Sequence, residues 1–370
     1  MEPHKQKLFL NIATLLLVSL LCIGIIAITY HYYRQQQTKN SQPIYITNDP
    51  EYSYETVSRQ GIRIANNGSL QLMLDPYTNY ILRSNQKTNK VTIDSHGFRG
   101  SFDDKDPRPR IAITGGSVAF GEGLNNDNET LAAVLERKNP KYQVINAGVT
   151  GFVSGQELAY QVNYLSDYHP KIVMSFSGWN DLTDICAKRY AKFEIRTYTY
   201  GVNEFFDHLE NQLIVLQNIQ GINNYTIGAG QYRNPEASLS DDEVIEKAYV
   251  TYVNNAVKMD AFAKGNGATF ILVIQPEITT KKIKTEEEKT HFETAKKNCD
   301  FQKRYKKLIQ YTTEKLDEQH VRYIDITNTP QYAAENETIF VDTVHLNAKG
   351  HALMAEIIKD YLHKNKIINE

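Results

Sequence analysis

Ser117 lies in a tight, glycine-rich turn that follows a strand-like run of residues. In the sequence IAITGGSVAFGEG, residues 111–114 lead directly into Gly115, Gly116 and Ser117. In such a turn several backbone N–H groups can point at one position and favour a negative charge beside the serine oxygen. Gly-Gly-Ser is also an ordinary turn composition. A serine nucleophile is therefore indicated only if a base and further donors come to the same place.

Asp342 and His345 provide a carboxylate and an imidazole three residues apart, in the sequence DTVHLNAKGHALM before the last predicted helix. At this spacing the carboxylate can hold the imidazole Nδ1–H, which leaves Nε2 free to take a proton from the Ser117 hydroxyl. Asp317 and His320 show the same spacing, but they end a predicted helix and precede a strand. That position is the amino edge of a sheet, where His320 is better explained as a favourable charge at a helix C-terminus.

Two further turns carry groups that can donate hydrogen bonds to a developing oxyanion. The sequence NAGVTGFVSGQE holds Gly151, whose N–H can approach a substrate oxygen without a side chain in the way. The sequence SGWNDL holds Asn180, whose side-chain NH₂ is a second donor beside the N–H of Ser117. Trp179 is interpreted either as a lining residue of the substrate pocket or as core packing. Asp181 is interpreted as a hydrogen-bond acceptor that organises the loop.

Apolar strand-like runs alternate with amphipathic helical patterns from residue 110 onward. This alternation predicts an α/β fold with a mostly parallel sheet that helices cover on both faces. Ligands of such sheets bind at the carboxyl ends of the strands, which is where the candidate site residues fall. The predicted strands are residues 110–114, 143–146, 171–177, 269–274 and 321–325, and the predicted helices are 129–138, 154–167, 241–264, 296–318 and 348–363.

Two stretches do not fit the alternation of strands and helices. Residues 182–240 are predicted to be an insertion that packs over one end of the sheet. Residues 279–291, TTKKIKTEEEKTH, are rich in Lys and Glu and are interpreted as a solvated loop or helix face.

These sequence blocks, in this order, resemble the SGNH hydrolase superfamily, also called the GDSL-like lipase/esterase family. The resemblance covers about residues 110–364. It implies a three-layer α/β/α fold of flavodoxin-like type and acyl-ester chemistry without a cofactor. In the family's terms Ser117 is the nucleophile, Gly151 and Asn180 are oxyanion donors, and Asp342 and His345 are the acid and base.

Two features depart from the family pattern. The first block reads GGSV where the family name implies Gly-Asp-Ser-Leu, and Trp179 stands between Gly178 and Asn180. The lead-in sequence DSHGFRG and the form GWND resemble a membrane-anchored bacterial subgroup whose substrates the sequence leaves open.

Charge and cysteine content exclude some classes of partner. The formal net charge of -2 over 370 residues gives no electrostatic reason to expect nucleic acid. The 3 cysteines have no metal-binding spacing, so no structural zinc is expected.

Cys22 falls in an apolar run, which leaves Cys186 and Cys299 for the domain. In an oxidising compartment this pair is predicted to form a disulfide, and two separately buried thiols are the alternative.

Residues 8–29 form an uncharged apolar run that is long enough to cross the roughly 30 Å hydrocarbon core of a bilayer. A cleaved signal peptide is the alternative, but its apolar region is usually shorter and ends in small residues. We therefore expect a single-pass anchor in the inner membrane, with the catalytic domain on the periplasmic or extracellular side. The predicted organisation is a cytoplasmic N-terminus 1–7, the anchor 8–29, a linker 30–59, a β-rich lead-in 60–109 and a hydrolase domain 110–364 with the insertion at about 182–240.

The sequence thus predicts a membrane-anchored serine esterase that removes an acyl group, for example acetyl, from an envelope glycan or lipid. An O-acyltransferase would use the same triad with a sugar hydroxyl in place of water. A non-catalytic glycan-binding or assembly module is the alternative outside the enzymes. Intact Ser117, Asn180, Asp342 and His345 argue against it, since binding alone would not require all of them. The oligomeric state stays open.

Overall fold

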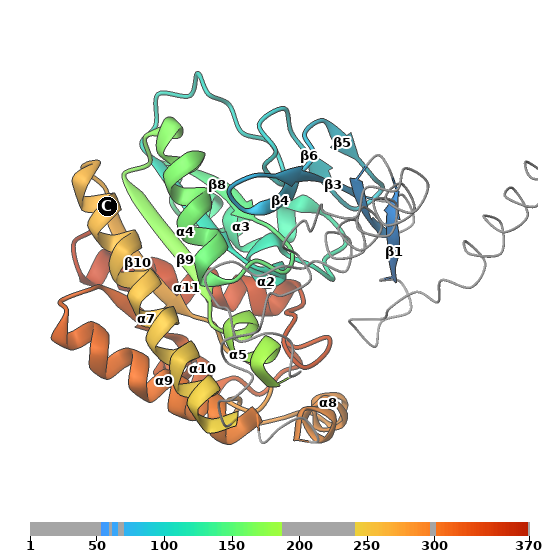
Figure 1. Ribbon diagram of the computed structural model, residues 1–370, viewed down its shortest axis with the longest axis vertical. Helices are drawn as coiled ribbons and strands as arrows, with labels where there is room; N and C mark the ends of the chain where they lie inside the picture. The colour runs from blue at the N-terminus through green and yellow to red at the C-terminus, as the bar shows by residue number, and fades with distance from the viewer. Residues whose placement is uncertain (1–52, 59–60, 66–69, 187–240, 297–300, 369–370) are drawn as a thin grey trace, which may run out of the picture. The chain divides into compact units, whose positions relative to one another are not determined.

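The computed structural model describes residues 53–58, 61–65, 70–186, 241–296 and 301–368 (Figure 1). All of them belong to the unit Ile46–Glu370. The predicted anchor and most of the predicted linker and insertion lie outside these residues, so their boundaries stay predictions. In the described part of the chain, no helix combines the length and the apolar character that a membrane crossing requires.

A five-stranded parallel sheet forms the centre of the fold. Its strands are β7 (Arg110–Gly115), β8 (Gln143–Gly148), β9 (Ile172–Ser177), β10 (Thr269–Ile274) and β11 (Tyr323–Asp325). Their order is β11-β10-β9-β7-β8, and every neighbouring pair is parallel. Gly115 at the end of β7 pairs with Gly148 of β8 and with Phe176 of β9. The loops that follow these three strands therefore begin at the same height along the strand direction, at the carboxyl edge of the sheet.

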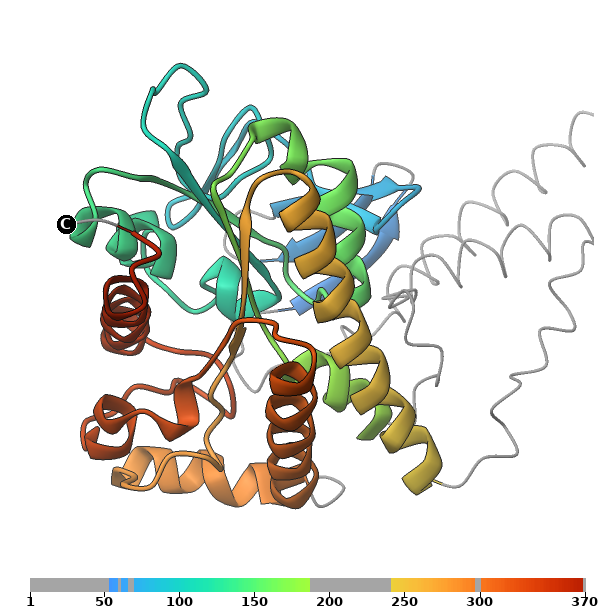
Figure 2. The same ribbon diagram turned by 90° about the vertical axis from the view of Figure 1, so that its left-hand side faces the viewer.

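Helices lie on both sides of the sheet, with α11 in red on one side and α7 in gold on the other (Figure 2). The helices are α2 (Ser117–Phe120), α3 (Leu131–Lys138), α4 (Ser154–Asn163), α5 (Trp179–Cys186), α7 (Asp241–Gly265), α8 (Glu286–Lys296), α9 (Phe301–Glu318), α10 (Pro330–Ala334) and α11 (Ala348–Lys364). Along β10, Ile271 and Val273 belong to one apolar core, and Phe270 and Leu272 belong to another. Successive side chains of a strand point to opposite faces, so each face of the sheet has its own core. The predicted three-layer α/β/α fold is confirmed.

The β-rich lead-in packs against the parallel sheet and its helices. Its antiparallel strands are β1 (Ser53–Ser58), β2 (Gly61–Ala65), β3 (Leu70–Asp75) and β4 (Asn79–Leu82), followed by the short pair β5 (Gln86–Lys87) and β6 (Thr92–Ile93). Buried Leu72, Tyr80 and Phe98 share an apolar core with Ile145 and Phe152. Strand β1 begins inside the segment that the sequence predicted as linker. The lead-in and the following domain therefore share one folded core.

The Lys- and Glu-rich stretch 279–291 is not wholly solvated, so that prediction was wrong for two of its charged residues. The side chains of Lys281 and Glu288 are 0% exposed and form an ion pair. Glu288 also accepts hydrogen bonds from the N–H groups of Ile339 at 2.9 Å and Phe340 at 3.3 Å. A buried ion pair persists when each charge has its partner and further hydrogen bonds. The pair thereby ties the start of α8 to the chain just before Asp342.

A buried carboxyl lies between helix α4 and strand β9. Glu157 is fully buried, and the Ser175 hydroxyl donates a hydrogen bond of 2.6 Å to its Oε2. Burial raises the pKa of Glu157 to about 8, although the Ser175 hydroxyl acts in the opposite direction. Glu157 therefore stays largely protonated at neutral pH in the folded protein.

The free energy of unfolding is expected to fall as pH rises from 4.5 to about 8, because only the folded chain keeps the Glu157 proton in this window. At about 1.4 kcal/mol per pKa unit, this group accounts for a loss of at most about 5 kcal/mol. Glu157→Gln removes the titration. Urea unfolding of both proteins near pH 5 and near pH 8.5 should show the larger fall in the wild type. Equal falls would contradict the assignment.

Candidate active site

Gly116 joins strand β7 to helix α2, whose first residue is Ser117. A Cβ atom on Gly116 would lie 2.3 Å from Nδ2 of Asn180, and one on Gly115 would lie 2.3 Å from the carbonyl oxygen of Phe176. Real Cβ atoms do not approach other atoms so closely. At Gly115 the neighbour is backbone and φ is +149°, so the turn requires glycine there, whereas at Gly116 the neighbour is the end of the flexible Asn180 side chain, which would have to move. Groups from the neighbouring strand β9 and helix α5 fill the space that side chains would otherwise occupy.

Ser117, His345 and Asp342 are joined in one line of hydrogen bonds. His345 Nε2 lies 2.8 Å from Ser117 Oγ, and His345 Nδ1 lies 2.6 Å from Asp342 Oδ2. An ionised carboxylate only accepts hydrogen bonds, so Nδ1 donates to Asp342 and Nε2 is left to accept the Ser117 proton. Ser117 and His345 are 228 residues apart in the sequence. The fold brings the three candidate residues together in the order that general-base activation of a serine requires.

The surroundings of Asp342 keep its carboxylate ionised. Oδ1 accepts the N–H groups of Val344 at 2.8 Å and His345 at 2.7 Å. Burial alone would raise the pKa of Asp342, but the His345 imidazole and these N–H groups hold the pKa well below its usual range. A bridge between Phe340 and Leu346 closes the turn that carries both residues. A permanently charged Asp342 can orient His345 and stabilise its imidazolium form.

The two predicted side donors follow the strands next to β7. Gly151 lies on the loop after β8, and Asn180 is the second residue of helix α5, after β9. Asn180 Nδ2 donates to the carbonyl oxygen of Phe152 at 2.8 Å. An amide NH₂ has two hydrogens, so one fixes the group and the other can serve a substrate oxygen. Gly151 has a φ of +83° in a turn that the Phe152 N–H closes on the Val149 carbonyl at 3.0 Å, as in a type II turn. Both residues stand at the same edge of the sheet as Ser117.

Asp181 and Trp179 make structural contacts next to Asn180. Asp181 Oδ1 accepts the Ser154 hydroxyl at 2.5 Å, and both carboxylate oxygens accept the Ser154 N–H at 3.2 Å. Asp181 thus organises the loop, as expected. Trp179 is partly buried, and its ring centroid lies 4.3 Å from that of Phe301. These contacts favour core packing for Trp179, and its contact with substrate stays a prediction.

The cysteine pair has only one described member. Cys186 is the last residue of α5, and Cys299 lies outside the described residues. The predicted disulfide between them therefore stays a prediction.

Glu122 and His351 interact electrostatically with His345 and were not predicted from the sequence. Glu122 is buried. Burial raises the pKa of Glu122, although His345 and Arg99 oppose the rise. Burial lowers the pKa of His351 to about 3, with Arg99 and His345 acting in the same direction, so this imidazole is neutral. The one sequence signal for Glu122 was a charged residue between two glycines directly after the serine turn.

Residues 111–358 match the family model of the GDSL-like lipases and acylhydrolases. The chain belongs to the GDSL-like lipase/acylhydrolase family. It is therefore an ester-hydrolysing enzyme, and the resemblance seen in the sequence is confirmed at the level of the family. The matched residues include the loops after every strand of the parallel sheet, with Ser117 at one end and His345 near the other.

Similar solved structures include a lipase/acylhydrolase from Enterococcus faecalis, at 15% identity and a TM-score of 0.40, with 70% of this chain and 96% of that chain covered. A GDSL-like lipase from Bacteroides thetaiotaomicron is 14% identical, with a TM-score of 0.38 and coverage of 69% of this chain and 88% of that chain. A two-domain esterase active on acetylated mannans is 16% identical, with a TM-score of 0.38 and coverage of 71% of this chain and 50% of that chain. None of the curated proteins compared with this sequence matches it.

Gly116→Ala is expected to lower kcat about 10²- to 10³-fold, the typical cost of losing one oxyanion donor. Gly116 has a φ of -81°, which alanine also adopts, so the backbone can stay in place. The new Cβ would lie 2.3 Å from Asn180 Nδ2, so the flexible amide is the group that moves. The measurement is kcat for a p-nitrophenyl ester, with Tm recorded to verify that the variant folds.

A double-mutant cycle tests the cause of this loss. In an Asn180→Ala background, Gly116→Ala should cost little more, because the donor that it displaces is already absent. Additive losses in the double variant would show that Gly116 acts through a group other than Asn180.

Proposed function

We propose that the protein hydrolyses acyl esters with Ser117 as nucleophile, His345 as general base and acid, and Asp342 as the carboxylate that orients His345. The supporting observation is the 2.8 Å distance between His345 Nε2 and Ser117 Oγ, on an imidazole whose other nitrogen faces a carboxylate. Membership of the GDSL-like lipase/acylhydrolase family agrees with this chemistry.

In the acylation half-reaction, His345 Nε2 takes the Ser117 proton as Oγ attacks the ester carbonyl carbon. The carbonyl oxygen becomes an oxyanion, which accepts hydrogen bonds from the N–H groups of Ser117 and Gly151 and from the Asn180 amide. The tetrahedral intermediate then expels the alcohol, which receives the proton from His345. Asp342 stays ionised and stabilises the transient imidazolium.

In the deacylation half-reaction, water takes the place of the alcohol. His345 removes a proton from the water, whose oxygen attacks the carbonyl carbon of the acyl-enzyme. The same donors hold the second oxyanion. Its breakdown returns the proton to Ser117 Oγ and releases the carboxylic acid.

For the substrate, we propose a short acyl group such as acetyl, carried by an envelope glycan or lipid, and a site of action outside the cytoplasm. The support for this part is the uncharged run 8–29, whose length and apolar character fit a membrane anchor, followed by a polar segment that fits a tether. Transfer to a sugar hydroxyl would use the same residues, because the choice between water and alcohol depends on pocket shape and water exclusion.

A fluorophosphonate is expected to label the full-length protein at Ser117, because this reagent reacts with activated serines. Ser117→Ala should abolish both labelling and ester hydrolysis. Asp342→Asn should lower kcat about 10⁴-fold, because the imidazole is then held in the wrong tautomer. Peptide mapping locates the label, and p-nitrophenyl acetate hydrolysis gives kcat. A folded wild-type protein that is never labelled would contradict the proposed function.

Protease added to the outer side of the inner membrane is expected to release a soluble fragment cut between residues 30 and 52, because an exposed polar tether is cut more readily than a folded domain. A C-terminal tag detected by immunoblotting would report the fragment. Protection of the tether in intact spheroplasts would contradict the orientation. A soluble domain before any protease is added would instead support the cleaved signal peptide.

A further inference from the structure

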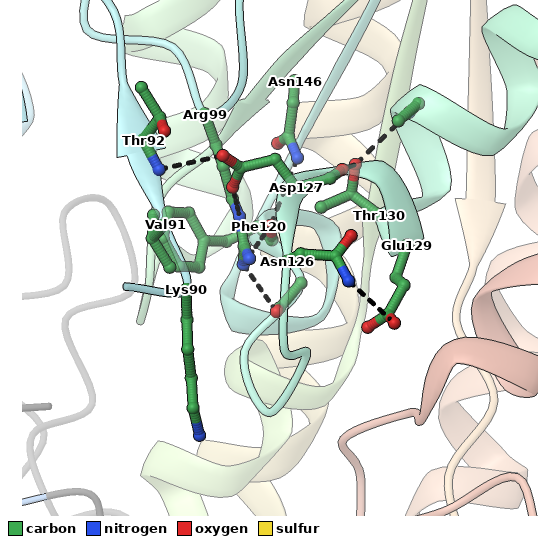
Figure 3. A network of polar contacts seen from close by, with 12 residues as sticks. Lys90, Val91, Thr92, Arg99, Phe120, Asn126, Asp127, Glu129, Thr130 and Asn146 are labelled. Atoms are coloured by element: carbon green, nitrogen blue, oxygen red, sulfur yellow. Dashed lines mark hydrogen bonds and ion pairs between the residues drawn. The ribbon is translucent and has the colours of Figure 1, made fainter. Parts of the chain in front are cut away.

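Arg99 reaches from the lead-in to the C-terminal end of helix α2. It precedes the residues that match the family model, and its side chain is only 1% exposed. Figure 3 shows its guanidinium beside Phe120 and Asp127, with Thr92 and Asn146 in the same network. Burial of a charged group is costly unless its N–H groups are paired, so the contacts of this guanidinium indicate its role.

The first set of contacts holds the end of helix α2. Arg99 Nη1 donates to the carbonyl oxygens of Phe120 at 3.2 Å and Gly121 at 2.6 Å. Carbonyl groups at the end of a helix cannot all be satisfied within it, and a cation there also complements the helix dipole. The N–H groups of Gly121 and Glu122 in turn donate to the Ser117 carbonyl, both at 2.9 Å. A single residue, Gly121, therefore connects Arg99 to the backbone of Ser117.

The second set of contacts fixes the guanidinium itself. Arg99 Nε donates to Asp127 Oδ1 at 3.0 Å, and Asp127 Oδ2 accepts the Thr92 N–H at 3.0 Å. The backbone N–H of Arg99 donates to the Asn146 carbonyl at 3.2 Å. The guanidinium carbon lies 4.7 Å from the centre of the Phe120 ring. The planar guanidinium is held at its Nε and on one face, and the Arg99 backbone is held as well. Arg99 therefore cannot shift without breaking several contacts.

We propose that Arg99 is a positioning residue for Ser117, which fixes helix α2 so that Oγ stays within reach of His345 Nε2. The inference rests on the proposed function, since it concerns the same nucleophile. Arg99 reaches Ser117 through the backbone of α2, and its charge also acts on Glu122 and His351, which interact electrostatically with His345. Neither route involves the substrate, so Arg99 changes the chemical step and leaves binding intact. A displacement of about 1 Å in a reacting group costs about 10²-fold in rate.

Arg99→Met keeps an unbranched stem beside Phe120 and removes every N–H donor of the side chain. The expected result is a kcat about 10²-fold lower, with KM for p-nitrophenyl acetate within about twofold of the wild-type value. The rate of fluorophosphonate labelling at Ser117 should fall by the same factor as kcat. Arg99→Lys keeps the positive charge beside Asp127 but replaces the planar guanidinium, with its several N–H donors, by a single ammonium group. Its kcat should therefore lie between those of the methionine variant and the wild type.

Arg108→Met is the matched control. Arg108 is a second lead-in arginine, whose guanidinium binds Asp106, Glu136 and the Tyr142 carbonyl at the amino edge of the sheet. The control should lower Tm without lowering kcat. It thereby separates the positioning of Ser117 from a general weakening of the lead-in.

Wild-type kcat in a folded Arg99→Met variant would overturn the proposal, as would equal losses of kcat in the Arg99→Met and Arg108→Met variants. In both cases Ser117 would still be labelled in the wild type, so the proposed function would stand. Absence of labelling in the wild type would overturn the proposed function instead. If Arg99→Met does not fold, Arg99→Lys decides: loss of kcat at unchanged KM supports the proposal, and wild-type kcat overturns it.

Discussion

The close approach of the Asn180 amide to the backbone of Gly116 is the constraint on which the geometry of the site depends. Strand register pairs Gly115 with Phe176, so α2 and α5, which follow strands β7 and β9, begin side by side. A residue with a Cβ at Gly116 would place that atom 2.3 Å from the amide nitrogen. This gives a physical reason for the block GGSV in this chain. In this backbone, the aspartate of the family name would displace the amide donor.

The layered fold was predictable because its parallel strands are buried on both faces. Such strands read as continuous apolar runs, and β8 and β9 are buried at every residue. The order of the predicted strands and helices also separated two Asp-x-x-His pairs of identical spacing, because it placed them at opposite edges of the sheet. His345 lies 2.8 Å from Ser117 Oγ, whereas His320 follows α9 and precedes β11, at the opposite edge of the sheet. The proximity of these residues is now a structural fact, and their catalytic roles remain the proposal.

Buried charges were the part of the structure that the sequence did not reveal. Lys281 and Glu288 belong to a run of charged residues that is typical of a solvated surface, yet both are buried. Glu288 is satisfied by the N–H groups of Ile339 and Phe340, about fifty positions later in the chain. Arg99 likewise depends on carbonyl groups of a helix in the following domain. Charge patterns indicate polarity, but the partners that allow burial are supplied only by tertiary contacts.

The separation of 228 positions between Ser117 and His345 also affects when the proposed activity can appear during protein synthesis. The turn that carries Ser117 is made early, but His345, the proposed base, is made only just before α11, the last helix of the described residues. Bringing such distant residues together costs loop-closure entropy, which the folding of the intervening chain must offset. On the proposed mechanism, a growing chain therefore carries an unactivated Ser117 until the segment that holds His345 has been translated. On the proposed mechanism, the order of the elements along the sequence thus couples ester cleavage to the folding of the intervening chain.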